Sequence, residues 1–157
     1  EVILPDKWYP VKIVLENNVY DDDINKFVDY NIHDVRIVVA LDKKLKMIEL
    51  VRGLDSMLDH MRADYAKWSK LGDDPHGTRA RMTEEYCASL HYYMGKKYVK
   101  ITDGCSVKAF VVACDDDKKF AYGDILKPAG WKTPARNFRR GNVLDRTFDR
   151  VRWTGAL

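Results

Sequence analysis

Residues 127–140, KPAGWKTPARNFRR, form the part of the sequence best suited to binding an anion. The stretch contains five lysines and arginines, no acid, and two aromatic residues, Trp131 and Phe138. Pro128 and Pro134 exclude a regular helix or a central strand, so we expect a loop. In such a loop, cations can contact phosphates while an aromatic ring stacks on a base. The composition therefore predicts a site for nucleic acid or another polyanion.

The predicted site extends into the residues that follow this loop. In the sequence RVRWT, an extended chain would place Arg150 and Arg152 on one face and Val151 and Trp153 on the other. We therefore predict a basic surface built from Trp131, Lys132, Arg136, Phe138, Arg139, Arg140, Arg150 and Arg152. The alternative is a structural loop, in which the two rings fill the core and the arginines pair with the protein's own carboxylates.

Charge is unevenly distributed along the 157-residue chain, whose formal net charge is +3. Residues 1–95 have 13 basic and 17 acidic side chains, whereas residues 96–157 have 14 basic and 7 acidic. This asymmetry is typical of a protein with a basic side that faces a partner. The chain is 46% hydrophobic and 32% charged, with no run of 18 apolar residues, so we expect a packed core and no membrane partner.

Metal and catalytic sites are weakly indicated. Cys87 and His91 are four residues apart in a predicted helix and would lie on one face, but zinc needs about two more ligands. The aspartate triplets at residues 21–23 and 115–117 lack EF-hand spacing and are expected to be solvated turns. No nucleotide-binding or hydrolase motif occurs. We therefore predict no metal and no cofactor, and favour a non-enzymatic protein.

The three cysteines, Cys87, Cys105 and Cys114, leave at least one thiol unpaired within the chain. Cys105 and Cys114 could face each other across a hairpin, but free buried thiols are favoured, and the odd number of cysteines indicates a reducing compartment.

Two N-terminal segments, residues 11–16 and 35–41, are rich in β-branched residues and predict strands. Between them, the acidic triplet would open a short helix over residues 24–30, because carboxylates favour a helix N-terminus. A polar turn over residues 31–34 would end that helix.

Residues 42–71 give the clearest helical pattern. Apolar residues recur at steps of four and three, which keeps them on one face of a helix: Met47, Val51, Leu54, Leu58, Met61, Tyr65 and Trp68. Asp42 is the expected N-cap and Gly72 the expected C′ residue. A second helix over residues 78–94, ended by Gly95, would complete an antiparallel hairpin packed within the chain. A coiled coil between chains is the alternative.

From residue 96 onward, apolar and polar residues alternate. Residues 98–102 and 105–114 flank the dipeptide Asp103-Gly104, which is typical of a two-residue type I′ turn. Another short hairpin or a bend is predicted over residues 120–122 and 124–127, and further short strands at residues 142–144 and 150–154. Together they would close a bent sheet or a partly open barrel.

Residues 123–145, GDILKPAGWKTPARNFRRGNVLD, together with SVKAFVV at residues 106–112, resemble a group of small bacteriophage proteins. The resemblance covers roughly a quarter of the chain. It implies a phage origin and the cytoplasm of an infected bacterium, and it carries over no activity and no functional residue.

We predict an α+β fold in one domain, residues 1–157. It would combine N-terminal strands (1–41), a long antiparallel helical hairpin (42–94) and a β-rich basic lobe (96–157) with a mixed or antiparallel sheet. The leading functional hypothesis is a non-enzymatic accessory protein that binds nucleic acid or another polyanion. The second is a protein-binding module, in which the hairpin forms a homodimer or captures a host protein. An enzyme of unrecognised type is the third.

Overall fold

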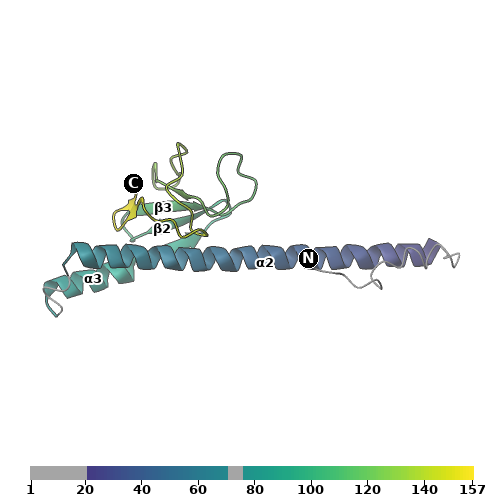
Figure 1. The fold of residues 1–157 in the computed structure, drawn as a ribbon, viewed down its shortest axis with the longest axis horizontal. Helices are drawn as coiled ribbons and strands as arrows, with labels where there is room; N and C mark the ends of the chain where they lie inside the picture. Colours follow the sequence, from purple (N-terminus) through teal and green to yellow (C-terminus); the bar gives the residue numbers. More distant parts are fainter. Residues whose placement is uncertain (1–20, 71–75) are drawn as a thin grey trace. The chain divides into compact units, whose positions relative to one another are not determined.

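The structure is a computed structural model that describes the backbone of residues 21–70 and 76–157, and side chains from Val28 onward (Figure 1). Contacts between Cα atoms divide the chain into two units, residues 1–45 and 46–157. Two helices, two antiparallel sheets and connecting loops make up the described residues, which is an α+β fold as predicted. The strand predicted at residues 11–16 lies outside the described residues.

Helix α2 (Asp21–Trp68) is continuous over 48 residues and belongs partly to each unit. Residues 35–41 are therefore helical rather than a strand, residues 31–34 are not a turn, and Asp42 lies inside the helix instead of capping it. The physical reason is that no glycine or proline occurs before Gly53 in this helix. The hydrogen-bond ladder therefore continues through the β-branched residues, each of which weakens a helix only slightly.

Helix α3 (Thr78–Ser89) runs antiparallel to the end of α2 and completes the predicted helical hairpin (Figure 1). The ring of Tyr86 stacks on that of Tyr65, with 4.2 Å between the ring centroids. The Ser69 hydroxyl, directly after α2, shares a hydrogen bond with the Thr83 hydroxyl of α3 over 3.1 Å. The expected C′ residue, Gly72, lies outside the described residues.

Strand β1 (His91–Met94) occupies the end of the segment that was predicted to be helical. α3 ends because Leu90 takes an extended conformation, after which β1 pairs with β2 (Tyr98–Thr102). Gly95 forms the turn between these strands and donates its N–H to the Tyr98 carbonyl over 3.1 Å, so it does not end a helix. Pairing along β1 thus replaces the continued helical ladder.

The main sheet is antiparallel, with strand order β1-β2-β3-β4. The predicted hairpin is present as β2 and β3 (Val107–Val112), and β4 (Ile125–Leu126) lies beyond β3. The turn is longer than the predicted two residues, because the Asp103 carboxylate accepts N–H groups from Cys105 and Ser106 at 3.2 and 2.7 Å. This side chain supports a four-residue loop in place of a type I′ turn.

Strands β5 (Val151–Arg152) and β6 (Gly155–Ala156) pair only with each other, so they do not close the main sheet. Residues 120–122 and 142–144 are not strands either. Asp124 and Asn142 form an isolated antiparallel bridge, and the Asp124 carboxylate also accepts the Ala121 N–H and the Asn142 amide, each at 3.0 Å. The predicted closure of the sheet by residues 142–144 and 150–154 is therefore wrong, because the first segment contributes a single bridge beside β4 and the second pairs with β6.

The core of the second unit lies between α2, α3 and the sheet. One sheet face, including Val99 and Ile101, packs with the buried residues Leu50, Leu54, Met57, Leu58, Met61 and Tyr65 of α2. The other face, which includes Phe110, is covered by Phe120 and its neighbours. The prediction that the hairpin packs within its own chain is confirmed for this part of α2.

The C-terminal residues are held against both helices by hydrogen bonds. The Tyr86 hydroxyl donates to the Trp153 carbonyl over 2.8 Å, and the Trp153 N–H donates to the Asp64 carboxylate over 2.9 Å. Further along α2, Gly53 lies so close to Val143 that a Cβ at this position would be 2.5 Å from the Val143 carbonyl oxygen. The absence of a side chain at Gly53 therefore lets the chain cross the helix.

Candidate functional site

Residues 127–140, here called the basic loop, fold back on themselves as an irregular hairpin. Pro128 and Pro134 form an isolated bridge. The N–H groups of Ala129 and Gly130 donate to the Thr133 carbonyl over 3.0 and 3.2 Å. These contacts place Trp131 and Lys132 at the tip of the hairpin, and both side chains are exposed.

Arg136 is used by the protein's own fold. Its guanidinium donates two hydrogen bonds to the Asp117 carboxylate, over 2.7 and 2.8 Å, and a third to the Tyr98 hydroxyl. The hydrogen bonds from Arg136 hold the pKa of Asp117 well below its usual range. The Lys97 ammonium lies 3.8 Å from the same carboxylate. This bidentate pair fixes the basic loop to the residues after β3.

Arg140 is only 5% exposed and donates to the main-chain carbonyls of Phe138, over 2.8 Å, and Leu157. Its guanidinium lies 3.4 Å from the centre of the Phe138 ring, and that of Arg150 lies 5.5 Å away. Burial, with the nearby charge of Arg150, lowers the pKa of Arg140. Phe138 therefore stacks on the protein's own cations, although its other surface is exposed.

Two more arginines of the predicted surface lie close to carboxylates. Arg139 is 3.4 Å from Asp124, and Arg152 is 3.5 Å from Asp64. Arg152 is exposed while Val151 is buried, as the predicted alternation requires. Four of the predicted cations thus have partners inside the molecule, which matches the structural alternative for the arginines but not for the exposed rings.

Trp131 belongs to a cluster that sequence reasoning missed. The Lys100 ammonium lies 4.6 Å from the centre of the Trp131 ring and 5.9 Å from that of Tyr93. Both rings are about half exposed, at 50% for Trp131 and 57% for Tyr93. Lys100 and Tyr93 face each other across β2 and β1. The sequence predicts a helix at residues 91–94, so it does not predict that Tyr93 and Lys100 pair. The alternation of apolar and polar residues after residue 96 does place Lys100 in a strand.

The paired Cys87 and His91 predicted from helical spacing do not share a helix, because α3 ends at Ser89 and His91 opens β1. All three thiols are free; Cys105 is exposed and the other two are half-buried, so the expectation of burial is wrong. In the part of the chain that the structure describes, no group of three metal-ligating side chains occurs.

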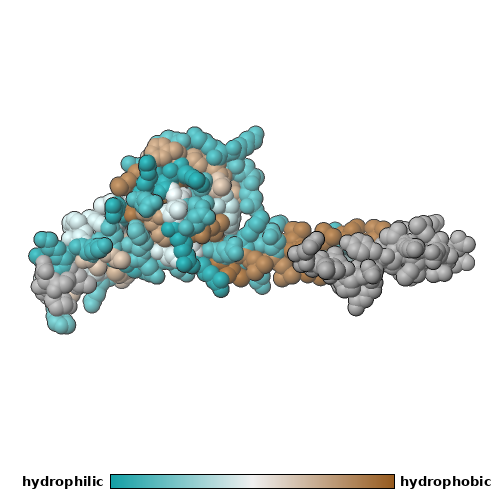
Figure 2. Space-filling model, viewed as in Figure 1, coloured by the Kyte–Doolittle hydropathy of each residue, from teal (hydrophilic) through white to brown (hydrophobic). Residues whose placement is uncertain are grey.

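The second candidate surface lies on α2 in the first unit. Residues 28–45, here called the apolar helical segment, expose nine large hydrophobic side chains: Val28, Tyr30, Ile32, Val35, Ile37, Val38, Val39, Leu41 and Leu45. They give α2 a stretch of brown surface in Figure 2. Val38 is 64% exposed. Monomeric proteins rarely expose so many adjacent apolar residues, which usually mark an interaction site.

These side chains form two stripes along the helix. Val28, Ile32, Val35 and Val39 follow steps of four, three and four, and Ile37, Leu41 and Leu45 follow steps of four. At 3.6 residues per turn, the stripes lie about 150° apart around the helix axis. A single neighbouring helix can therefore cover one stripe but not both. No helix of the described residues is long and apolar enough to cross a lipid bilayer.

A model of a protein family of unknown function (DUF7717) matches residues 35–157, well over half of the chain. The chain belongs to this family. The matched range takes in the whole second unit and residues 35–45 of the apolar helical segment, so both candidate surfaces lie at least partly within the DUF7717 region. Neither a curated protein nor a solved structure matches the chain.

Proposed function

We propose that the protein is a self-assembling interaction protein whose apolar helical segments pair with those of further copies of the chain. The observation that carries this proposal is the run of nine exposed hydrophobic residues on α2. A helix that is apolar on more than one side is normally buried among other helices. The β-branched residues at steps of four and three are also typical of the seam between paired helices.

Charge along α2 favours a second copy as the occupant, in antiparallel orientation. Residues 21–34 contain five aspartates and one lysine, whereas residues 35–45 contain three cations and one aspartate. In an antiparallel pair, the acidic end of each segment meets the basic end of the other. Electrostatic complementarity of this kind sets the orientation of partners and speeds their association.

Two stripes require two neighbours for each helix. A closed ring in which all neighbours are antiparallel needs an even number of helices, so the smallest such arrangement is a four-helix bundle. Each helix of such a bundle has its two neighbours about 90° apart, which fits the nearest edges of the two stripes, because Val35 and Leu45 lie about 80° apart around the helix axis. The segment spans about 26 Å, at 1.5 Å per residue. The proposal is therefore a tetramer of the 18.3 kDa chain.

Light scattering on the full chain tests this proposal. The wild-type protein is expected at four times the mass of one chain. The double variant Val35→Glu/Val39→Glu disrupts one stripe and should be a dimer, because each helix then keeps one neighbour. Adding Leu41→Glu/Leu45→Glu should give a monomer. His33→Glu places the same new charge between the stripes and should leave the tetramer intact.

A wild-type monomer at micromolar concentration would overturn the proposal, and would mean that the segment is covered in another way. A tetramer that survives all four substitutions would also overturn it, because assembly would then use another surface. The phage origin and the cytoplasmic location stay predictions.

A further inference from the structure

We propose that Tyr93, Lys100 and Trp131, here called the aromatic platform, bind single-stranded nucleic acid by stacking its bases. This site differs from the basic surface predicted from the sequence. It keeps Trp131 of that surface and adds Tyr93 and Lys100 from the sheet. Lysines near the platform, Lys132 among them, take the role first assigned to the arginines, which are paired within the protein.

The geometry provides two rings that contact the same cation. Tyr93 and Lys100 are opposite each other on β1 and β2, and Trp131 lies at the tip of the basic loop. The Lys100 ammonium is within 6 Å of both ring centres, which is the range of a cation–π contact. These contacts link both rings to one positive charge, while about half of each ring residue stays exposed.

The segments that build the platform contain no acid. Residues 91–102 and 125–140 together have eight lysines and arginines and not one aspartate or glutamate. Internal contacts occupy Lys97, Arg136, Arg139 and Arg140. The four remaining cations have no ion pair with a described carboxylate and are available to phosphates: Lys96, Lys100, Lys127 and Lys132.

The combination of rings and lysines favours a single strand over a duplex. Bases in a duplex stack on each other, so their faces are not accessible to a side chain. In a single strand the faces are free, and aromatic stacking acts together with phosphate contacts along the backbone. The exposed rings would add nothing to the binding of a polyanion that has no bases.

Two labelled oligomers of about 15 nucleotides separate stacking from charge. One is oligothymidylate and the other is an abasic backbone with the same number of phosphates. Fluorescence anisotropy is expected to show that the abasic oligomer binds more weakly, by about 5- to 150-fold for each base that stacks on a ring. With four lysines engaged, log Kd should change with log salt concentration by a slope of about 2 to 3 in magnitude.

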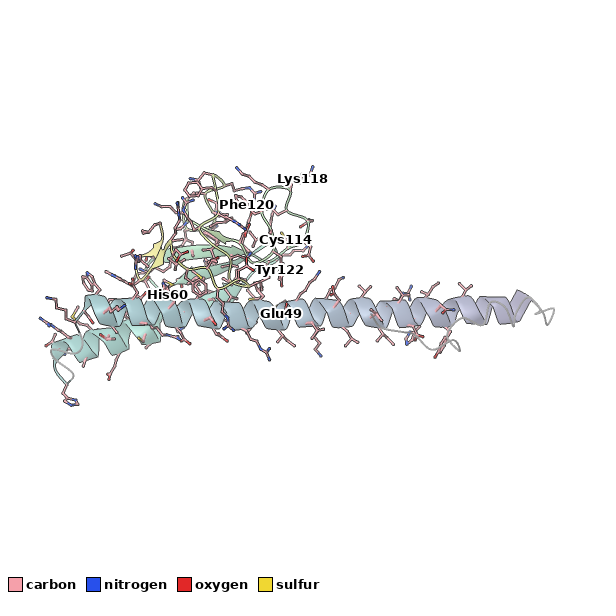
Figure 3. The ribbon with its side chains drawn as sticks, in the orientation of Figure 1. Glu49, His60, Cys114, Lys118, Phe120 and Tyr122 are labelled. Carbon is pink, nitrogen blue, oxygen red and sulfur yellow. The ribbon has the colours of Figure 1, made fainter. Side chains whose placement is uncertain are left out.

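Variants of the platform sharpen the test. Trp131→Ala should weaken oligothymidylate binding about 5- to 100-fold and leave the affinity for the abasic oligomer nearly unchanged. Trp131→Phe retains a ring and should restore most of the loss. Lys100→Ala should lower the salt slope by about 0.7. Lys118→Ala removes an exposed lysine that extends outward from another loop (Figure 3) and should change neither quantity.

Thermal unfolding controls for misfolding, and no shift is expected for Trp131→Ala, because this residue lies half-exposed at a loop tip. Repeating the titrations in the four-substitution monomer separates this site from assembly, since several linked sites raise apparent affinity. Equal binding of both oligomers, full binding by Trp131→Ala, or no binding at low salt would each overturn the proposal.

Discussion

The two parts of α2 contain similar apolar residues in very different surroundings. In the second unit, Leu54 is fully buried against the sheet, whereas Leu41 in the first unit is 55% exposed. Both parts repeat hydrophobic residues at steps of three and four. The difference is that α3, the sheet and the C-terminal residues pack on the buried part of α2. Hydrophobic periodicity therefore shows that a helix face will be covered, but not by what.

The comparison also explains why the apolar helical segment needs a partner while the second unit does not. A residue already buried in the same chain contributes to the stability of the folded unit. An exposed apolar residue contributes only when another surface removes it from water. Substitutions in the two parts should therefore change different measured quantities.

The largest expected effect comes from truncating the buried part. Leu54→Ala should lower the free energy of unfolding of the second unit by about 2–5 kcal/mol, because it leaves a cavity in the core. Leu41→Ala should change that free energy by less than about 0.5 kcal/mol and weaken assembly instead. Near-UV circular dichroism of the Tyr65–Tyr86–Trp153 cluster, followed in urea, reports on the second unit.

Equal losses of stability in these two variants would break the comparison. They would show that the apolar helical segment is also part of the core of one chain. Light scattering on Leu41→Ala provides the complementary measurement, with a shift toward smaller species expected at low concentration.

The second expected effect is a loss of stability on replacing Gly53 by alanine, opposite in sign to the usual effect of this substitution in a helix. Replacing a glycine inside a helix by alanine normally stabilises it by about 0.5–1 kcal/mol. Gly53→Ala should instead destabilise the second unit by about 1–3 kcal/mol, because the new Cβ would be 2.5 Å from the Val143 carbonyl oxygen. In the exposed part, Ala40→Gly should follow the ordinary rule and cost about 0.5–1 kcal/mol of helix stability.

Urea titration of the Gly53→Ala protein decides the sign. A higher free energy of unfolding would mean that the segment around Val143 can move away from α2 and make room for the new Cβ. Far-UV circular dichroism of Ala40→Gly provides the control in the first unit, where only local helix content should fall.

Much of the fold was predictable because its local patterns agree with its tertiary packing. The helical hairpin and the β2–β3 pair followed from periodicity. The middle of the predicted stripe is buried, from Leu54 to Tyr65, whereas Met47 and Trp68 at its two ends are exposed. The errors arose where a local preference was overridden. Residues 35–41 have side chains typical of strands, yet they form part of α2. The helix continues through them because no glycine or proline interrupts its backbone hydrogen bonds.

The candidate surfaces were harder to predict, because they depend on which charges find partners. Arg136 and Arg140 appear free in the sequence, but their partners are Asp117, 19 residues away, and main-chain carbonyls of Phe138 and Leu157. Lys100 gains its importance from Tyr93 and Trp131, which only the strand register and the loop bring together. Composition locates the cations; tertiary contacts decide which of them remain available.

The third and smallest expected effect on stability comes from the ion pair between Arg136 and Asp117 in the second unit. The hydrogen bonds from Arg136 lower the pKa of Asp117 in the folded state. This contribution to stability is therefore fully present above the unfolded pKa of about 3.9 and is lost as the pH falls through the lower folded value. The effect is modest because the Arg136 side chain is more than a third exposed to solvent.

Comparing wild type with Asp117→Asn across acid pH isolates this contribution. The difference in their free energies of unfolding should be constant from neutral pH to about pH 5 and then shrink steadily as acid protonates the carboxylate. Asp116→Asn is the matched control, because this exposed neighbour has no contact with Arg136, and its difference from wild type should not follow the same course. A difference between wild type and Asp117→Asn that grows toward acid pH would have the wrong sign for a carboxylate held ionised by Arg136. Such a result would mean that the pair of Arg136 and Asp117 does not anchor the basic loop. Arg136 would then be as available to a ligand as the lysines near the aromatic platform, and the distinction between paired arginines and available lysines would fail.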